Sequence, residues 1–125
     1  LIPKIFDAVK NGKEIEIYGD GLQMRDFTHI NDVLTAFHQS IKLLNESSGS
    51  IYEIFNIGNH QPISINTLVE LIEMELKTTI KRSYVSKQIG DTQSTFADIT
   101  KAKSILKLFV RNAFKCIFVK VWLGF

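Results

Sequence analysis

The sequence predicts an α/β fold. The prediction rests on the alternation of its apolar patterns, and the composition is consistent with a globular protein. Segments with apolar residues at helical spacing alternate with short segments rich in β-forming residues. The 125 residues are 45% hydrophobic and 22% charged, which is typical of a soluble globular protein and excludes a disordered tail, a collagen-like repeat and a long coiled coil. The pattern predicts three strands and four helices. Because a stand-alone α/β domain normally has more strands to cover its helices, we expect a partial fold that belongs to a larger one.

The N-terminal segment is predicted to form a helix followed by a strand. Residues 3–9 place their apolar side chains on one face of a helix, and Pro3 is tolerated in a first turn. Residues 14–18 alternate polar and apolar side chains, as a half-buried strand does. The sequence Gly19-Asp20-Gly21 then predicts a turn, and residues 24–30 are expected to form an irregular connector.

The central segment is predicted to contain a second helix and a second strand. Asn31 is a favourable N-cap, and the helix that follows it carries an apolar stripe of Val33, Phe37, Ile41 and Leu44. Residues 51–57 are rich in β-forming residues and end at Gly58-Asn59, so they predict a buried strand.

The remaining elements are two helices on either side of a strand. Ser64 is expected to cap a third helix, whose stripe is Ile65, Leu68, Val69, Ile72 and Leu76. Residues 78–85 predict the third strand, and Thr100 is expected to cap a short helix that continues through Leu106.

Charge is distributed unevenly along the chain. Residues 1–98 contain nine basic and thirteen acidic side chains, whereas residues 99–125 contain six basic and no acidic ones. The basic residues at the end are spaced among aromatic ones, which does not favour a nucleic-acid-binding arm. The apolar run from Cys116 to Phe125 is far shorter than the ~20 residues of a membrane-spanning helix, and no secretory signal pattern opens the chain. Cys116 is the single cysteine, so an intrachain disulfide is excluded and a reducing, cytoplasmic location is expected. The absence of an initiating Met suggests that Leu1 is not a natural start.

Three short motifs contain residue types suited to binding a nucleotide. The first follows the strand at 14–18, where two glycines precede Arg25, a side chain that can grip a phosphate through two parallel hydrogen bonds. The second is Phe55-Asn56-Ile57-Gly58-Asn59, at the end of a predicted strand, where α/β proteins collect ligands. The third is Gln88-Ile89-Gly90-Asp91, whose carboxylate could accept hydrogen bonds from ribose hydroxyls. Taken singly, each motif is explained equally well as a turn.

Other kinds of site are less well supported. The histidines His29, His38 and His60 lie in different elements without the spacing of metal ligands, with His38 on the exposed side of a helix and His60 in a loop. No serine is singled out for a catalytic triad, and neither a dinucleotide fingerprint nor a P-loop is present.

In their order, the motifs resemble the C-terminal part of the extended short-chain dehydrogenase/reductases that act on nucleotide sugars, the NAD-dependent epimerase/dehydratases. The resemblance covers residues 1–106 and is carried by Ile17-Tyr18-Gly19-Asp20-Gly21, Arg25-Asp26-Phe27-Thr28-His29-Ile30-Asn31-Asp32, Phe55-Asn56-Ile57-Gly58-Asn59, and Gly90-Asp91 with Ala97-Asp98 and Lys101-Ala102-Lys103. Gln88 and Thr95-Phe96-Ala97-Asp98 are similar to the UDP-glucuronate 4-epimerase branch, whereas many UDP-glucose-type epimerases have Arg at the position of Gln88.

The resemblance implies a site for the UDP part of a nucleotide sugar. Arg25 matches a residue that contacts the pyrophosphate, Asp91 lies near the ribose, and Gln88 lines the same pocket. Asp26 and Asp32 are expected to fix the loop and the helix start, and Asn56 and Asn59 to order the turn. In this family, bound NAD takes hydride from C4 of the sugar and returns it to the other face, and intact members are usually homodimers.

The chain also departs from the family pattern. The Gly-rich NAD loop and the Tyr-x-x-x-Lys pair lie upstream of anything present, so we expect no NAD binding and no epimerisation by this chain alone. Residues 107–125 lack the family's acidic helix, which suggests a divergent or frameshifted tail. Without the nucleotide-binding half, we expect Val33, Phe37, Ile54 and Phe55 to face water and favour aggregation.

Several functions remain open at this point. The first is an inactive fragment of a nucleotide-sugar 4-epimerase that binds a UDP-sugar, and the second is a non-catalytic UDP-sugar-binding module. A tail that binds membrane surfaces is less favoured, so we expect neither a membrane nor a nucleic-acid partner. Within the enzyme class, dTDP-glucose 4,6-dehydratase, UDP-glucuronate decarboxylase and UDP-glucose 4-epimerase share the Arg-Asp motif and stay as alternatives.

Overall fold

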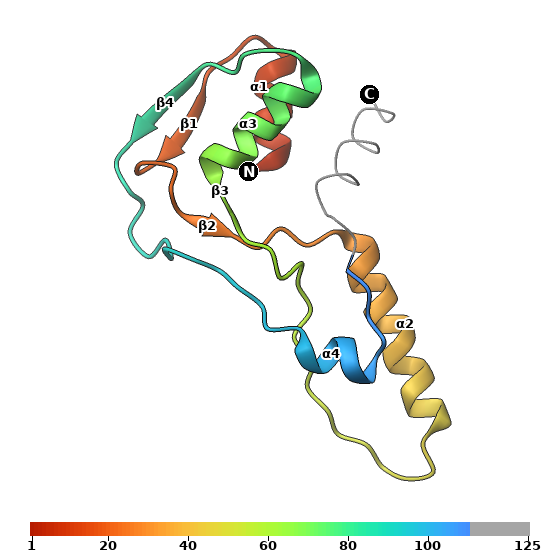
Figure 1. The fold of residues 1–125 in the computed structure, drawn as a ribbon. Helices are drawn as coiled ribbons and strands as arrows, with labels where there is room; N and C mark the ends of the chain where they lie inside the picture. Colours follow the sequence, from red (N-terminus) through yellow and green to blue (C-terminus); the bar gives the residue numbers. More distant parts are fainter. Residues whose placement is uncertain (111–125) are drawn as a thin grey trace. The chain divides into compact units, whose positions relative to one another are not determined.

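The computed structural model describes residues 1–110, so the sequence predictions for 111–125 lie outside the described residues. Within residues 1–110 the chain forms a partial α/β fold of helices and short strands (Figure 1). The chain divides into two compact units. Unit 1 consists of Leu1–Arg25 and Ile63–Thr95, and unit 2 contains Asp26–Pro62 and the described residues from 96 onward. None of the helices in residues 1–110 is both long enough and apolar enough to cross a membrane.

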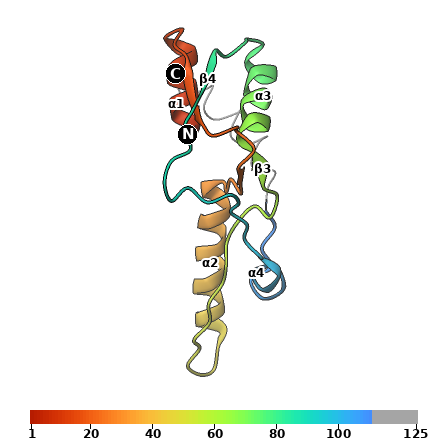
Figure 2. The ribbon, with the colours of Figure 1, turned by 90° about the vertical axis from the view of Figure 1, so that its left-hand side faces the viewer.

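Unit 1 is built on a pair of parallel strands. β1 (Ile15–Tyr18) pairs with β4 (Arg82–Val85) along their whole lengths. The predicted alternation is confirmed, because Ile15 and Ile17 are buried and Glu16 and Tyr18 are exposed. Helices α1 (Ile2–Lys10) and α3 (Ile65–Leu76) lie on one face of this pair (Figures 1 and 2).

The core of unit 1 forms where these helices meet the strands. The predicted stripe of α3 is confirmed for Leu68, Val69 and Ile72, each of which is fully buried. Burying one such side chain contributes about 1.5–3 kcal/mol. Ser64 caps α3 as predicted, since its side-chain oxygen accepts a hydrogen bond from the Thr67 amide at 3.0 Å.

Two predictions for unit 1 need correction. The strand predicted at 78–85 begins only at Arg82, because Lys77 takes a left-handed conformation that ends α3 and the partner strand β1 is four residues long. The connector predicted at 24–30 contains a short strand, β2 (Met24–Arg25), which pairs antiparallel with β3 (Ile63–Ser64). Two-residue strands carry no detectable alternation, so the sequence pattern did not indicate them.

In unit 2 the N-caps of both helices differ from the prediction. α2 (Ile30–Glu46) is capped by His29 rather than Asn31, because His29 has an extended backbone and its ring nitrogen Nδ1 accepts the Asn31 amide at 3.2 Å. α4 (Thr100–Ile105) has Ile99 at its N-cap, and Thr100 is its first helical residue. The Asp98 carboxylate accepts both the Thr100 amide at 3.0 Å and its hydroxyl at 2.6 Å. These hydrogen bonds lower the pKa of Asp98.

The strand predicted at 51–57 is absent, since these residues take no regular secondary structure. A strand needs a neighbour to complete its backbone hydrogen bonds, and no described strand pairs with this segment. Side-chain contacts hold residues 51–57 in place instead of backbone pairing. Phe55 and Ile57 pack against a buried cluster of Ala36, Ala102, Leu106 and Leu108. Lys101 forms a 2.5 Å ion pair with Glu53 and lies 5.2 Å above the centre of the Phe55 ring.

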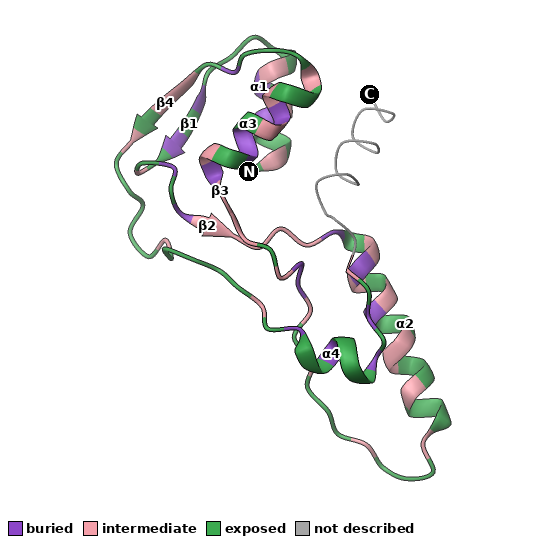
Figure 3. Cartoon of the chain, in the orientation of Figure 1, coloured by how far each residue is buried: buried purple, intermediate pink, exposed green. Residues whose placement is uncertain are grey.

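One side of α2 is apolar and exposed. Figure 3 marks the exposed residues along this helix in green. Its large side chains recur at helical spacing and are each more than half exposed: Ile30, Leu34, Phe37, Ile41 and Leu44. The predicted exposure is confirmed for Phe37 and Ile54, which are both 66% exposed. The prediction is wrong for Val33 and Phe55, which are half-buried, because Phe55 packs on the cluster in its own unit.

An acid-sensitive ion pair joins α3 to β4. Glu73 accepts the Ile80 amide at 2.8 Å and an Arg82 guanidinium proton at 2.6 Å, and its side chain is 18% exposed. Burial by itself raises the pKa of the Glu73 carboxyl, but these hydrogen bonds and the Arg82 charge outweigh it and leave the pKa below its ordinary value. The pair therefore stabilises unit 1 fully above the ordinary glutamate pKa, and this stability is lost as pH falls through the lowered value.

We expect Glu73→Gln to lower the free energy of unfolding by about 1 kcal/mol at neutral pH, and to leave a smaller difference from the wild type in acid. Urea unfolding at a series of pH values measures this. Glu75→Gln, at an exposed position of the same helix, is the matched control and should change little. An equal effect of both substitutions at every pH would contradict the assignment.

Candidate functional site

Arg25 and Asp91 come from two different sequence motifs and meet in unit 1. They are 66 positions apart in the sequence, and the Arg25 Nη2 donates to the Asp91 Oδ1 in an ion pair. The Arg25 Nη1 also donates to the carbonyl oxygen of Met24 at 2.7 Å. The two side chains are 21% and 27% exposed, so the pair is partly shielded from water but remains accessible.

Main-chain hydrogen bonds hold this pair in place. Arg25 lies in β2, beside Ile63 of β3. The segment that carries Asp91 is fixed to β2 on both sides of Met24, because the Met24 amide donates to the Gln93 carbonyl at 2.9 Å and the Thr95 amide donates to the Met24 carbonyl at 3.1 Å. A turn closes the loop, since the Asp91 amide donates to the Gln88 carbonyl at 3.2 Å. The position of Asp91 beside Arg25 therefore follows from backbone pairing.

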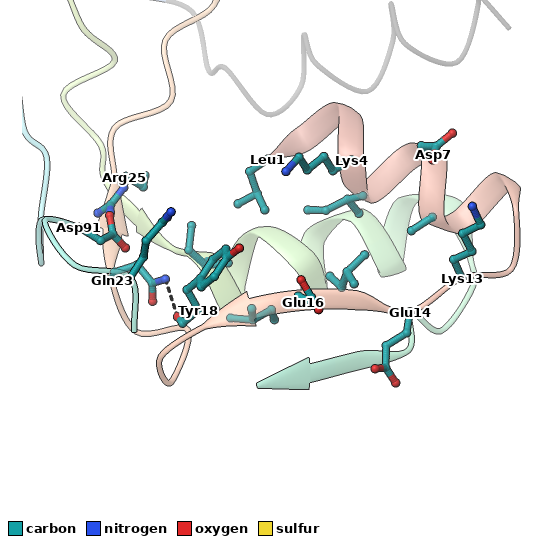
Figure 4. Close-up of a pocket in the computed structure, with 16 residues that line it drawn as sticks. Leu1, Lys4, Asp7, Lys13, Glu14, Glu16, Tyr18, Gln23, Arg25 and Asp91 are labelled. Carbon is teal, nitrogen blue, oxygen red and sulfur yellow. Dashed lines mark hydrogen bonds and ion pairs between the residues drawn. The ribbon is translucent and has the colours of Figure 1, made fainter. Parts of the chain in front are cut away.

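All three residues that the sequence predicts for substrate binding line one hollow of unit 1. This hollow has a volume of about 580 Å³ and is bordered by Arg25, Gln88 and Asp91 together with α1 and β1. Figure 4 shows Arg25, Asp91, Gln23 and Tyr18 at one end, and Lys13 and Glu14 at the other. The arrangement combines a guanidinium, a carboxylate and an amide beside the exposed aromatic ring of Tyr18. These groups suit a ligand that has an anionic group and hydroxyls.

Two residues of the hollow were not singled out by any motif. Gln23 is buried, and its Nε2 donates to the Tyr18 carbonyl at 2.9 Å, which ties the turn after β1 to the strand. Lys4 lines the hollow from α1 and adds a cation to its border, besides Arg25 and Lys13. Neither position has a local sequence signal, because Gln23 is placed by its hydrogen bond to Tyr18 and Lys4 by the position of α1 beside β1.

Asp26, next to Arg25 in the sequence, belongs to unit 2 and has its own partners. Its Oδ2 accepts the His60 amide at 3.1 Å and the Ala97 amide at 3.3 Å, and its Oδ1 accepts the Gln61 amide at 3.2 Å. The predicted loop-fixing role of Asp26 is thus confirmed. Asp32 is buried in the first turn of α2.

The second motif is packed within unit 2. A Cβ at Gly58 would lie 2.4 Å from the Ala97 Cβ and 2.8 Å from the Asp26 Oδ2, so only glycine fits there. Asn56 is exposed and Asn59 is buried, with its Nδ2 lacking a hydrogen-bond partner among the described residues. His38 is exposed on α2 and His60 lies in a loop, as predicted. Within residues 1–110 no group of His, Cys, Asp and Glu side chains is arranged to hold a metal ion.

The glycines after β1 do not form a dinucleotide cradle. A dinucleotide loop runs from a strand into a helix N-terminus, whereas Gly19 and Gly21 lead into β2. Gly21 has φ +74°, and a Cβ there would lie 2.2 Å from the Asn66 side-chain oxygen, so its small size admits Asn66. The turn at Gly19 and Gly21 is therefore not the phosphate-binding loop of a dinucleotide site.

The comparisons with known proteins find relatives of this sequence and solved structures with this fold. Residues 1–58 match the NAD dependent epimerase/dehydratase family. A UDP-glucuronate 4-epimerase of Thermodesulfobacterium geofontis is 42% identical over 95 residues, which are 75% of this chain and 28% of that protein. The solved structure of MoeE5 in complex with UDP-glucuronic acid and NAD is 34% identical, with a TM-score of 0.76, over 89% of this chain and 36% of that one.

A UDP-N-acetylglucosamine 4-epimerase from Methanobrevibacter ruminantium M1, solved in complex with UDP-N-acetylmuramic acid, is 26% identical. It superimposes with a TM-score of 0.84 over 99% of this chain and 39% of its own. The chain thus spans well under half the length of these three proteins. Together these matches define an α/β chain that is similar to one part of these proteins. The chain belongs to the NAD dependent epimerase/dehydratase family.

Proposed function

We propose that this chain is the nucleotide-sugar-binding portion of a 4-epimerase of the UDP-glucuronate type, and that the UDP part of the substrate binds in the hollow of unit 1. The observation that carries the proposal is the convergence of Arg25, Gln88 and Asp91, from two motifs, on one accessible hollow. The substrate class is supported by the relative that is 42% identical, a UDP-glucuronate 4-epimerase.

Each of the three side chains has a role in binding. Arg25 donates parallel hydrogen bonds to the diphosphate, for which a planar guanidinium is well suited. Asp91 accepts hydrogen bonds from the ribose hydroxyls, and Gln88 borders the same ligand from an exposed position. The reaction itself needs a hydride acceptor, which NAD supplies in the intact family. Because the turn at Gly19 and Gly21 is not a dinucleotide loop, the part that we assign to this chain is to bind and orient the substrate.

We further propose that the apolar side of α2 packs against the NAD-binding portion of the complete protein. The chain spans 28% of its relative's length, and Ile30, Leu34, Phe37, Ile41 and Leu44 form a continuous exposed row. Exposed apolar rows of this length are uncommon on isolated soluble domains and mark interaction surfaces.

Titration calorimetry with UDP tests the binding proposal. We expect the chain to bind UDP and Arg25→Ala to weaken the affinity by about 10- to 100-fold, because one or two hydrogen bonds to a charged group are lost. Lys81→Ala removes an exposed cation that does not border the hollow and should leave the affinity unchanged. Equal losses in both variants would indicate non-specific attraction between cations and phosphate, and the proposal would fail.

A further inference from the structure

The guanidinium proposed to bind phosphate already has an anionic partner in this chain. Arg25 Nη2 donates to the Asp91 Oδ1, and both side chains border the hollow. Both are partly exposed, at 21% and 27%, so a ligand entering the hollow reaches the ion pair directly. An incoming phosphate therefore competes with Asp91 for the same donors.

Asp91 keeps this position without help from a ligand. The hydrogen bonds that hold residues 88–95 to β2 are made by the main chain of Met24, Gln93 and Thr95. The Asp91 side chain takes no part in them. A substitution that removes only its negative charge therefore leaves the segment in place, and the charge can be tested separately from the fold.

We propose that Arg25 and Asp91 act as a counter-ion latch that ligand binding opens by exchange of partners. A phosphate group takes the place of Asp91 on the guanidinium, and the released carboxylate accepts hydrogen bonds from ligand hydroxyls. This inference rests on the proposed function and adds to it. The latch favours ligands that carry both an anionic group and hydroxyls. A ligand that has the anionic group but no hydroxyls leaves the Asp91 carboxylate unpaired and close to the negative charge of that ligand.

The latch predicts opposite effects for two probes when the Asp91 charge is removed. Asp91→Asn keeps the size of the side chain but no longer competes strongly for Arg25 or repels phosphate. Inorganic pyrophosphate should therefore bind about three- to tenfold more tightly at low salt, a range that reflects partial exposure of the pair. UDP should gain less than pyrophosphate or lose affinity, because asparagine is the weaker acceptor for its ribose hydroxyls.

The test is calorimetric titration of the full chain with pyrophosphate and with UDP, using the wild type, Asp91→Asn and Glu70→Gln. Glu70→Gln removes the same charge from an exposed position of α3 that does not border the hollow. The latch is supported if only Asp91→Asn gains affinity for pyrophosphate and its ratio of UDP to pyrophosphate affinity falls. Equal gains in both variants, or no gain in Asp91→Asn, overturn it.

The outcomes separate the latch from the proposed function. If the wild type binds UDP through Arg25 but Asp91→Asn gains nothing for pyrophosphate, the latch fails and the proposed function stands. If the wild type binds no UDP but only Asp91→Asn gains affinity for pyrophosphate, the competition between Asp91 and phosphate for Arg25 is supported, whereas the proposed function and the binding of ligand hydroxyls by Asp91 fail. If no variant binds either probe, both are overturned.

Discussion

Gly21→Ala is expected to lower the free energy of unfolding of the chain by about 2–4 kcal/mol or more. Two costs add at this position. An alanine at φ +74° is strained, which costs about 1 kcal/mol or more. Its Cβ would also lie 2.2 Å from the Asn66 oxygen, and relieving such an overlap costs about 1–3 kcal/mol.

Asn66 cannot move away without breaking other bonds. Its side-chain Nδ2 donates to the Asp20 carbonyl at 3.0 Å, and its Oδ1 accepts the Tyr84 hydroxyl at 3.2 Å. Its main-chain amide also donates to the Gly21 carbonyl at 3.0 Å. These contacts join the turn after β1 to α3 and β4. Because β2 follows this turn directly, we expect Gly21→Ala to weaken UDP binding as well as stability.

Gly12→Ala is the matched control for Gly21→Ala. Gly12 has φ +62°, and a Cβ there would meet nothing within 4 Å, so the substitution carries strain without overlap. We expect it to cost about 1 kcal/mol. Thermal and urea unfolding measure both variants, and Asn66→Ala in the Gly21→Ala background should recover part of the loss. If Gly12→Ala and Gly21→Ala were equally destabilising, the overlap with Asn66 would not contribute to the destabilisation, which would contradict this prediction.

Asp26→Ala is expected to have the second largest effect, a loss of about 2–4 kcal/mol in the free energy of unfolding. Its carboxylate accepts three backbone amides, those of His60, Gln61 and Ala97, at 3.1, 3.2 and 3.3 Å. Alanine leaves these donors without that acceptor. Asp26→Asn should lower the free energy of unfolding by less than Asp26→Ala. The asparagine keeps one oxygen acceptor, but its side-chain nitrogen, a donor, lies next to main-chain N–H donors.

Hydrogen exchange followed by NMR gives the specific readout for Asp26. We expect the amides of His60, Gln61 and Ala97 to exchange faster in Asp26→Ala than in the wild type. Asp20→Ala is the control, because within residues 1–110 the Asp20 carboxylate accepts only a local amide, that of Leu22 at 3.0 Å. Unchanged exchange at those three amides in Asp26→Ala would refute the loop-fixing role.

Periodicity along the sequence was sufficient to predict the helices and the strand β1. The stripe of α3 and the alternation in β1 are visible locally, because each side chain's burial repeats with the period of its element. The local sequence pattern did not indicate which distant segments pair with each other. The segment at 51–57 has strand-forming residues but no described partner strand. β2 forms because β3 and residues 93–95 lie beside it.

The candidate site was predictable in its parts but not in its arrangement. Residue types indicated Arg25 and Asp91 separately, and each was equally consistent with a simple turn. Only the fold brings the two together, through main-chain bonds between β2 and residues 93–95. In the fold, Asp26 binds partners that differ from those of its sequence neighbour Arg25. The spacing of residues in the sequence does not indicate this difference. The contributions of Gln23 and Lys4 depend on the folded structure, through a hydrogen bond to Tyr18 for Gln23 and through the position of α1 for Lys4.

The most direct measurement is to map UDP onto the ¹⁵N-labelled chain by NMR chemical-shift perturbation. The proposed function predicts saturable shifts concentrated at Arg25, Gln88 and Asp91 and along β1, which borders the same hollow. It also predicts weaker shifts at these positions with uridine or pyrophosphate alone, since each offers half of the ligand. Shifts confined to Asp26–Pro62, or an absence of saturable shifts in unit 1, would contradict a nucleotide-sugar site in this hollow.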